Sequence, residues 1–134
     1  MTDNRRQDSA FLPGPELMQE AFPPLPLCWP ALTDQEQEEQ LEALTDWTRW
    51  IAQCYALDHR IIPPCWAQHG ALLEELSALR TAWLTAFAVT SPGDAPLDWH
   101  AHFAAARQRL VDWVSRTGCR SGEHRPDSAG PCPR

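Results

Sequence analysis

Apolar residues recur every three or four positions in three segments of the chain, and polar residues fill most of the positions between them. This spacing places the apolar side chains on one face of a helix, so we expect helices over residues 33 to 55, 64 to 87 and 96 to 117. No segment alternates with the period of two that a half-buried strand requires. Helices of about 22 residues joined by loops of about six residues commonly pack as an antiparallel bundle. The sequence therefore predicts an all-α fold, an antiparallel three-helix bundle.

The predicted helix ends carry local signals. Thr33 and Glu36 have the Thr-x-x-Glu spacing of a capping box, in which each side chain binds the other residue's backbone N–H. The pair Pro63-Pro64 precedes the second apolar segment, and proline is tolerated in a first helical turn because its missing N–H would have no partner there. Gly118 follows the third segment, where a left-handed residue commonly ends a helix.

The two ends of the chain differ in composition from these segments. Residues 1 to 32 are rich in proline and polar residues, and residues 126 to 134 are rich in Pro, Gly and Ser. We predict a disordered Pro-rich arm over residues 1 to 32, a helical domain over residues 33 to 125 and a disordered tail over residues 126 to 134. Residues 22 to 29 are unusually apolar for such an arm. We interpret them as part of a linker, and the alternative is a docking motif or a segment laid across the bundle.

Most of the tryptophans lie on or beside the apolar faces. The chain has seven of them, and large aromatic side chains supply much of the buried area of a core. We therefore expect the core to include Trp47, Trp50, Trp83, Trp99 and Trp113. On the third helix we also expect an inward orientation for Leu97, Phe103, Leu110 and Val114.

Two Cys/His pairs lie at the start of the second predicted helix and just after the end of the third. Cys65 and His69 are four residues apart, on one face of the expected first turn of the second helix, and Cys119 and His124 follow the end of the third. In an antiparallel pair of nearly equal length, the start of one helix lies beside the end of the other. Two cysteines and two histidines are a common tetrahedral ligand set for structural zinc. The sequence therefore predicts a zinc site formed by Cys65, His69, Cys119 and His124.

Other ligand sets stay open. Cys54 and His59 have the same spacing as the second pair, and we expect them at the same end of the bundle, where they could replace one pair or add a ligand. Alternatively, the cysteines could be small buried residues without a metal, because such Cys/His spacings also arise by chance. His100 and His102 lie at the opposite end, where we expect His100 to pack against the end of the second helix.

Composition and charge limit the classes of function. The net charge is −7, which argues against non-specific binding to nucleic acid because such binding neutralises phosphates. No apolar run reaches the roughly 18 residues that span a bilayer, and the first residues lack the apolar segment of a secretory signal. We therefore expect a cytoplasmic protein without a membrane partner. Its five cysteines should then be reduced, which favours metal ligands or core residues over disulfides.

A catalytic role finds little support. Cys65 beside a histidine could form an activated thiol, but a closed site with four protein ligands has no open position for a substrate. We therefore expect no enzyme activity. Arg109, Arg116 and Arg120 share one helical face and form a possible interaction surface, although an ordinary solvated face is the favoured interpretation.

Several of these residues also form a recognisable set. The most specific element is Pro64-Cys65-Trp66 followed by His69, and the set also includes Glu75-Leu76, Ala78-Leu79, Trp99-His100, Trp113, Cys119 and His124. Over residues 44 to 125 this pattern resembles an uncharacterised actinobacterial family of unknown function. Members tend to accompany plasmid, integrative-element and conjugative-transfer genes. The resemblance implies no activity, but it implies a mobile-element setting and adds weight to the four predicted ligands.

Together these features predict a non-enzymatic, zinc-stapled helical interaction module, meaning a domain whose helices are held together at one end by zinc. The resemblance implies an accessory protein of a mobile element or conjugative-transfer system with a protein partner. Two alternatives stay open. The first is a transcription-related regulator that binds DNA or a sigma-type factor through the arginine face or the arm, and the more distant one is a thiol enzyme.

Overall fold

The computed structural model describes residues 24–120 and 123–127. Three α-helices form most of this region: α2 (Asp34–Cys54), α3 (Gly70–Ala86) and α4 (Ala95–Thr117). Two short 3₁₀ helices, η2 (Trp29–Ala31) and η3 (Trp66–Gln68), precede α2 and α3. No strand forms within the described residues, so the all-α, three-helix prediction is confirmed. Most of the predicted arm and tail, residues 1–23 and 128–134, lies outside the described residues.

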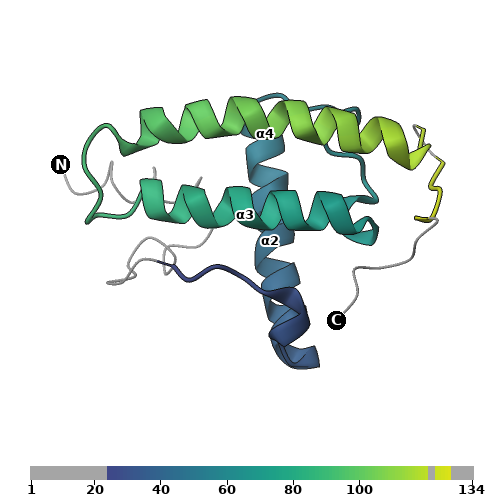
Figure 1. The fold of residues 1–134 in the computed structure, drawn as a ribbon, viewed down its shortest axis with the longest axis horizontal. Coiled ribbons are helices and arrows are strands. Elements are labelled where there is room, and N and C mark those ends of the chain that lie inside the picture. The colour runs from purple at the N-terminus through teal and green to yellow at the C-terminus, as the bar shows by residue number, and fades with distance from the viewer. Residues whose placement is uncertain (1–23, 121–122, 128–134) are drawn as a thin grey trace.

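α3 and α4 lie side by side and run in opposite directions, whereas α2 lies across them (Figure 1). The end of α2 meets the first half of α4, where the Tyr55 hydroxyl is 2.9 Å from His100 Nε2 and the rings of Tyr55 and Phe103 are 4.8 Å apart. We expected this end of α2 to reach the end of the bundle that holds Cys65, and that expectation is wrong. Residues 55 to 69 separate α2 from α3, and a connection of this length can span the distance between them.

Tryptophan rings are prominent in the core, and Trp47, Trp83 and Trp99 are buried there as the sequence predicts. Trp47 and Trp83 are fully buried with ring centroids 6.2 Å apart, and the half-buried Trp50 packs edge-on against Trp83 at 5.4 Å. On α4, buried Trp99 stacks on Phe103 at 5.0 Å. Buried residues of all three helices belong to one apolar cluster.

Two residues of α4 that were expected to point inward do not. Trp113 is 38% exposed and carries the guanidinium of Arg116 over its ring, and Leu97 is 72% exposed. Each residue of a helix advances about 100° around its axis. Leu97 is therefore turned by about 200° from Trp99, and Trp113 lies at the edge of the buried face that includes Val114.

Part of the predicted arm packs onto the helices. Trp29 is buried, and its Nε1 donates a 2.8 Å hydrogen bond to Ser77 Oγ on α3. The Trp29 carbonyl accepts a 3.0 Å hydrogen bond from Gln37 Nε2 on α2. Interpreting this stretch as a linker is therefore wrong around Trp29, and the segment laid across the bundle is the better description. A buried indole with a satisfied N–H stabilises such an attachment.

The predicted helix signals have mixed outcomes. The capping box is present, since the Glu36 N–H donates to Thr33 Oγ1 at 3.2 Å and the Thr33 N–H donates to Glu36 Oε1 at 3.0 Å. Gly118 ends α4 in the left-handed region, with φ of 75°. The second helix, however, does not begin at Pro64. The chain forms η3 first, and α3 begins at Gly70.

Candidate metal centre

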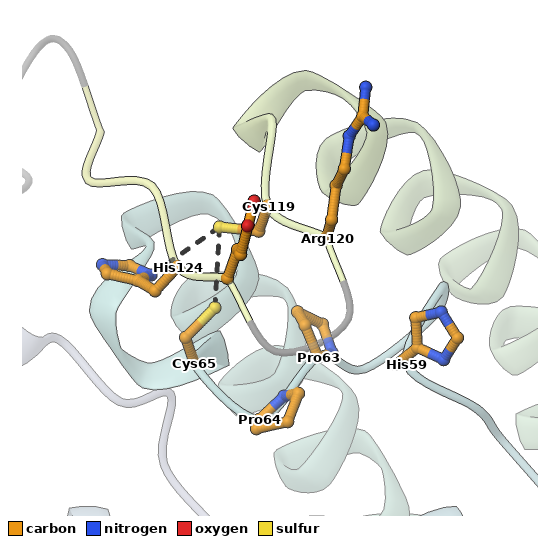
Figure 2. Close-up of a pocket in the computed structure, with 8 residues that line it drawn as sticks. His59, Pro63, Pro64, Cys65, Cys119, Arg120 and His124 are labelled. Carbon is orange, nitrogen blue, oxygen red and sulfur yellow. Dashed lines mark hydrogen bonds between the residues drawn. The ribbon is translucent and has the colours of Figure 1, made fainter.

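Four metal-binding side chains converge where α3 begins and α4 ends. Cys65 directly precedes η3, and His69 lies between η3 and α3. Cys119 follows the end of α4. Arg120 and Glu123 then exchange two backbone hydrogen bonds, of 3.0 and 2.8 Å, and this pairing turns the chain so that the next residue, His124, faces Cys119 (Figure 2). The sequence-predicted set of four is therefore brought together.

The first pair meets by a different backbone route from the predicted one. Cys65 and His69 do not share a regular α-helical turn, because η3 lies between them and His69 is extended, with φ of −115° and ψ of 117°. Their functional atoms are nevertheless close, with 3.4 Å between Cys65 Sγ and His69 Nε2. The 3₁₀ turn thus still brings the side chains of Cys65 and His69 together, although α3 begins only at Gly70.

Four of the separations between the donor atoms are close to the edges of a tetrahedral zinc site. The two sulfurs are 3.7 Å apart, and Cys119 Sγ is 3.3 Å from His69 Nε2 and 3.6 Å from His124 Nδ1. All four donor atoms lie within 4.8 Å of one another. Tetrahedral bonds to zinc would separate two sulfurs by about 3.8 Å and a sulfur and a nitrogen by about 3.6 Å. The group therefore could hold a single metal ion with small adjustments.

Asp127 contacts the ring nitrogen of His69 that does not face the two sulfurs. Its Oδ1 is 2.6 Å from His69 Nδ1, and its Oδ2 accepts a 3.3 Å hydrogen bond from the Gly70 N–H at the start of α3. The His69 side chain is almost fully buried. A carboxylate in this position makes Nδ1 the donor and leaves Nε2 free to bind a metal, as in many metal sites.

Asp127 lies in the segment predicted to be a disordered tail, and its contact with His69 was not predicted. The only available signal was an acidic residue three positions after the last predicted ligand, His124. A carboxylate near a ligand histidine is too common in sequences to indicate a contact without the fold.

The backbone around Cys119 favours a thiolate. The Arg125 N–H donates to Cys119 Sγ at 3.0 Å, and the Cys119 N–H donates to Thr117 Oγ1 at 3.1 Å. Burial alone would raise the pKa of this thiol, but the hydrogen bonds, led by that from Arg125, lower the pKa of Cys119 to about 6. Because metals bind thiolates, this arrangement prepares Cys119 as a ligand.

The other titratable groups respond to their neighbours. Burial raises the pKa of the Cys65 thiol, and the adjacent Cys119 raises it further. Burial alone would lower the pKa of His69, but hydrogen bonds to Asp127 and Cys119 raise that pKa above its ordinary value. The hydrogen bond with His69 lowers the pKa of Asp127. A bound cation would reverse the effect on Cys65, because a positive charge favours the thiolate.

The alternative ligands lie outside this group. Cys54 is exposed at the end of α2, and exposed His59 lies beyond Pro63, away from the two sulfurs (Figure 2). The structure thus does not bring this pair to the four-residue group. His100 pairs with Tyr55 at the end of α2, so the expectation that it packs against the end of the second helix is wrong.

A pocket of about 240 Å³ opens beside the two sulfurs. Its walls come from the turn before η3 and from the segment after α4 (Figure 2). The lining residues are His59, Pro63, Pro64, Cys65, Cys119, Arg120, Glu123 and His124. The site is therefore buried on the side of His69 and accessible on the side of the sulfurs.

The three arginines proposed as an interaction surface have different surroundings. Arg109 forms an ion pair with Glu75 of α3, and Arg116 covers the ring of Trp113 at 5.1 Å. Arg120 follows the end of α4 and lines the pocket. Two of the three thus contact neighbours within the domain, which reduces the charge available to a partner.

Comparisons with known proteins give no further assignment. No family model matches the chain, and neither the curated proteins nor the solved structures yield a match. The resemblance described above therefore stays a prediction. Among the described residues, no helix combines the length and the apolar character needed to cross a membrane.

Proposed function

We propose that Cys65, His69, Cys119 and His124 hold one zinc ion and that the chain is a non-enzymatic, zinc-stapled interaction module. The observation that carries the proposal is that four separations between the donor atoms, 3.3 to 3.7 Å, are close to those in a tetrahedral zinc site, and that all four atoms lie within 4.8 Å of one another. Asp127, which orients His69, gives independent support, because ligand histidines commonly have such a partner.

The donor set favours zinc over other metals. Two thiolates and two imidazoles suit a borderline-soft ion without geometric preference of its own, whereas magnesium and calcium prefer oxygen ligands. Four protein ligands complete the coordination of zinc and leave no position for a substrate. A structural role follows from this closed set.

Zinc in this position would stabilise the domain by joining distant parts of the chain. The ligands come from two segments that flank α3 and α4, at positions 65 to 69 and 119 to 124. Zinc binding to such sites contributes on the order of 10 kcal/mol of apparent free energy near neutral pH. This is of the same order as the whole stability of a small domain, and the part observed in solution depends on the free zinc concentration relative to the dissociation constant.

Metal analysis of the purified full chain tests the zinc site. We expect one zinc per chain, and we expect Cys65→Ser and Cys119→Ser each to lose it. Cys54→Ser is the matched control, because Cys54 is exposed and lies outside the four-residue group, and this variant should keep its zinc. Full zinc retention in both ligand variants would rule out the proposed coordination.

A thiol enzyme is a second candidate because Cys65, His69 and Asp127 form a Cys–His–Asp arrangement. The relevant separations are 3.4 Å for the sulfur and imidazole and 2.6 Å for the imidazole and carboxylate. An activated thiol of this kind reacts rapidly with iodoacetamide. If Cys65 is a ligand instead, bound zinc should protect it from alkylation and a chelator should expose it. Rapid alkylation of Cys65 in zinc-loaded protein would favour the enzyme.

The protein partner and the mobile-element setting rest on the sequence resemblance and stay predictions. A quantitative pull-down from a host that carries such an element would test them, with the zinc-deficient Cys119→Ser variant as the comparison. We expect a partner encoded by the transfer system to bind the zinc-loaded chain. Equal recovery of that partner with both proteins would separate binding from the zinc site.

A further inference from the structure

We propose that Cys65 and Cys119 are a site of oxidative modification, at which a peroxide joins the two sulfurs in a reversible disulfide and zinc is released. This inference rests on the proposed zinc site. It assigns the site a second, redox-dependent state in which a covalent bond replaces the metal.

The two sulfurs are already close enough to react with each other. Cys65 Sγ and Cys119 Sγ are 3.7 Å apart, and a disulfide bond requires about 2.05 Å. Neither cysteine belongs to a regular α-helix, since Cys65 precedes η3 and Cys119 follows α4. The approach therefore needs a movement of less than about 2 Å in two loop segments, without unwinding a helix.

The same two sulfurs are reachable from solvent. Both line the pocket of about 240 Å³, and both cysteines are only partly buried. A peroxide molecule is far smaller than this pocket and can approach the sulfurs from the side opposite His69. Sulfur oxidation depends on thiolate character and access, and zinc keeps cysteines in the thiolate form.

The chemistry balances with hydrogen peroxide as the oxidant. One thiolate attacks the O–O bond, a sulfur–oxygen bond forms, and hydroxide leaves, giving a sulfenic acid. The second thiolate then attacks this sulfur, the sulfur–sulfur bond forms, and a second hydroxide leaves. The two sulfurs lose two electrons in total, the peroxide gains two, and two protons convert the hydroxides to water. Zinc, left with two histidines, dissociates.

The oxidised domain should stay folded. The disulfide joins the same two segments that zinc joins, so the end of the α3–α4 pair remains cross-linked. His69 keeps its contact with Asp127, but His124 loses the metal that connected it to the other ligands. The main structural change is therefore expected after Cys119, in the segment that reaches Asp127.

The test uses the zinc-loaded full chain with Cys28→Ser, Cys54→Ser and Cys132→Ser, so that only the two proposed thiols are present. Hydrogen peroxide is added in steps, and free zinc, free thiols and intact mass are followed together. We expect one zinc released for every two thiols lost, a mass lower by two hydrogens, and unchanged helical circular dichroism. A thiol reductant with added zinc should restore the starting state.

Two outcomes would overturn the proposal. In the first, the triple variant keeps its zinc at a peroxide dose that oxidises the exposed Cys54 when the unaltered protein is treated in the same way. In the second, zinc leaves but the mass increases by oxygen atoms without a disulfide. Either result leaves the zinc site itself intact as a proposal. If the chain contains no zinc before peroxide is added, both the zinc site and this inference fail.

Discussion

The two ends of the α3–α4 pair are closed by different kinds of side chain. Where α3 ends and α4 begins, Phe87 stacks on Trp83 at 5.1 Å and packs edge-on against Trp99 at 6.3 Å. We call these three residues the aromatic end. We call Cys65, His69, Cys119 and His124, at the opposite end of the pair, the ligand end.

The difference shows how a small domain can combine contacts that stabilise it under all conditions with contacts that depend on metal content or redox state. Burial of aromatic rings stabilises the folded state whatever the metal content or redox state. The ligand end gathers polar donors around a histidine that is only 1% exposed, and buried polar groups are costly without partners. Stability at this end should therefore depend on what the donors bind, whereas stability at the aromatic end should not.

The largest expected effect removes a ring from the aromatic end. Trp83→Ala should lower the free energy of unfolding by about 3 to 5 kcal/mol, because it leaves a cavity in contact with Trp47 and Trp50. Chemical denaturation followed by circular dichroism measures this loss, which should be similar with and without zinc. Trp113→Ala is the matched control on the exposed side of α4. An equal cost at both positions would contradict the proposed division.

Removing zinc should lower the stability of the domain and loosen the ligand end most. With free zinc about a thousandfold above its dissociation constant, a chelator should lower stability by about 4 kcal/mol. Hydrogen exchange should then accelerate most around Gly70 and after Cys119, and less at the amides near Trp83 and Trp99, which remain packed in the core. Loss of protection at both ends in equal measure would mean that the two ends are not separable.

Asp127→Asn sharpens the comparison within the ligand end. The amide keeps the shape of the side chain but removes the negative charge beside His69 Nδ1. Zinc affinity should fall by about 10- to 100-fold, the usual effect of losing such a carboxylate. Competition with a chromogenic chelator measures the change. Asp112→Asn, an exposed acid on α4, should leave the affinity unaltered, and equal effects of both variants would argue for general electrostatics instead.

The sequence predicted the helices and the four-residue group because both follow from spacing. Apolar periodicity determines which faces are buried, and an antiparallel pair then places the residues after α4 beside those before α3. The error at Pro64 did not matter for the same reason, since the 3₁₀ turn still directs Cys65 and His69 to one side.

Features that depend on how particular side chains fit together could not be predicted in this way. The crossing of α2 depends on how its rings fit against α3, and the burial of Trp29 depends on the hydroxyl of Ser77 on a later helix. Asp127 likewise acquires its role only when His69 and Gly70 are nearby. Trp29 and Asp127 both lie outside the periodic helices, so no packing direction could be predicted for their side chains.

A smaller effect is expected where α4 gives way to the ligand end. Gly118 has φ of 75°, and a Cβ there would lie 2.9 Å from Cδ of Arg125. Gly118→Ala should cost about 1 to 2 kcal/mol, because the left-handed conformation is unfavourable for alanine and the Arg125 side chain must move. Gly93→Ala, at a position with open space around it, is the control and should change stability little. If Gly118→Ala destabilises only the ligand end, the variant should also bind zinc more weakly.

The smallest effect concerns the start of α2, which contributes to neither end. Thr33→Ala removes the oxygen that accepts from the Glu36 N–H and should cost about 1 kcal/mol. The hydrogen bond from the Thr33 backbone lowers the pKa of Glu36 below its ordinary value of 4.5. This carboxylate therefore stabilises the fold above that value, and the contribution disappears as the pH falls through the lowered pKa. Glu36→Gln keeps an acceptor but cannot titrate, so it should remove this part of the acid dependence at any zinc concentration. An acid dependence that changed with zinc instead would place its origin at the ligand end.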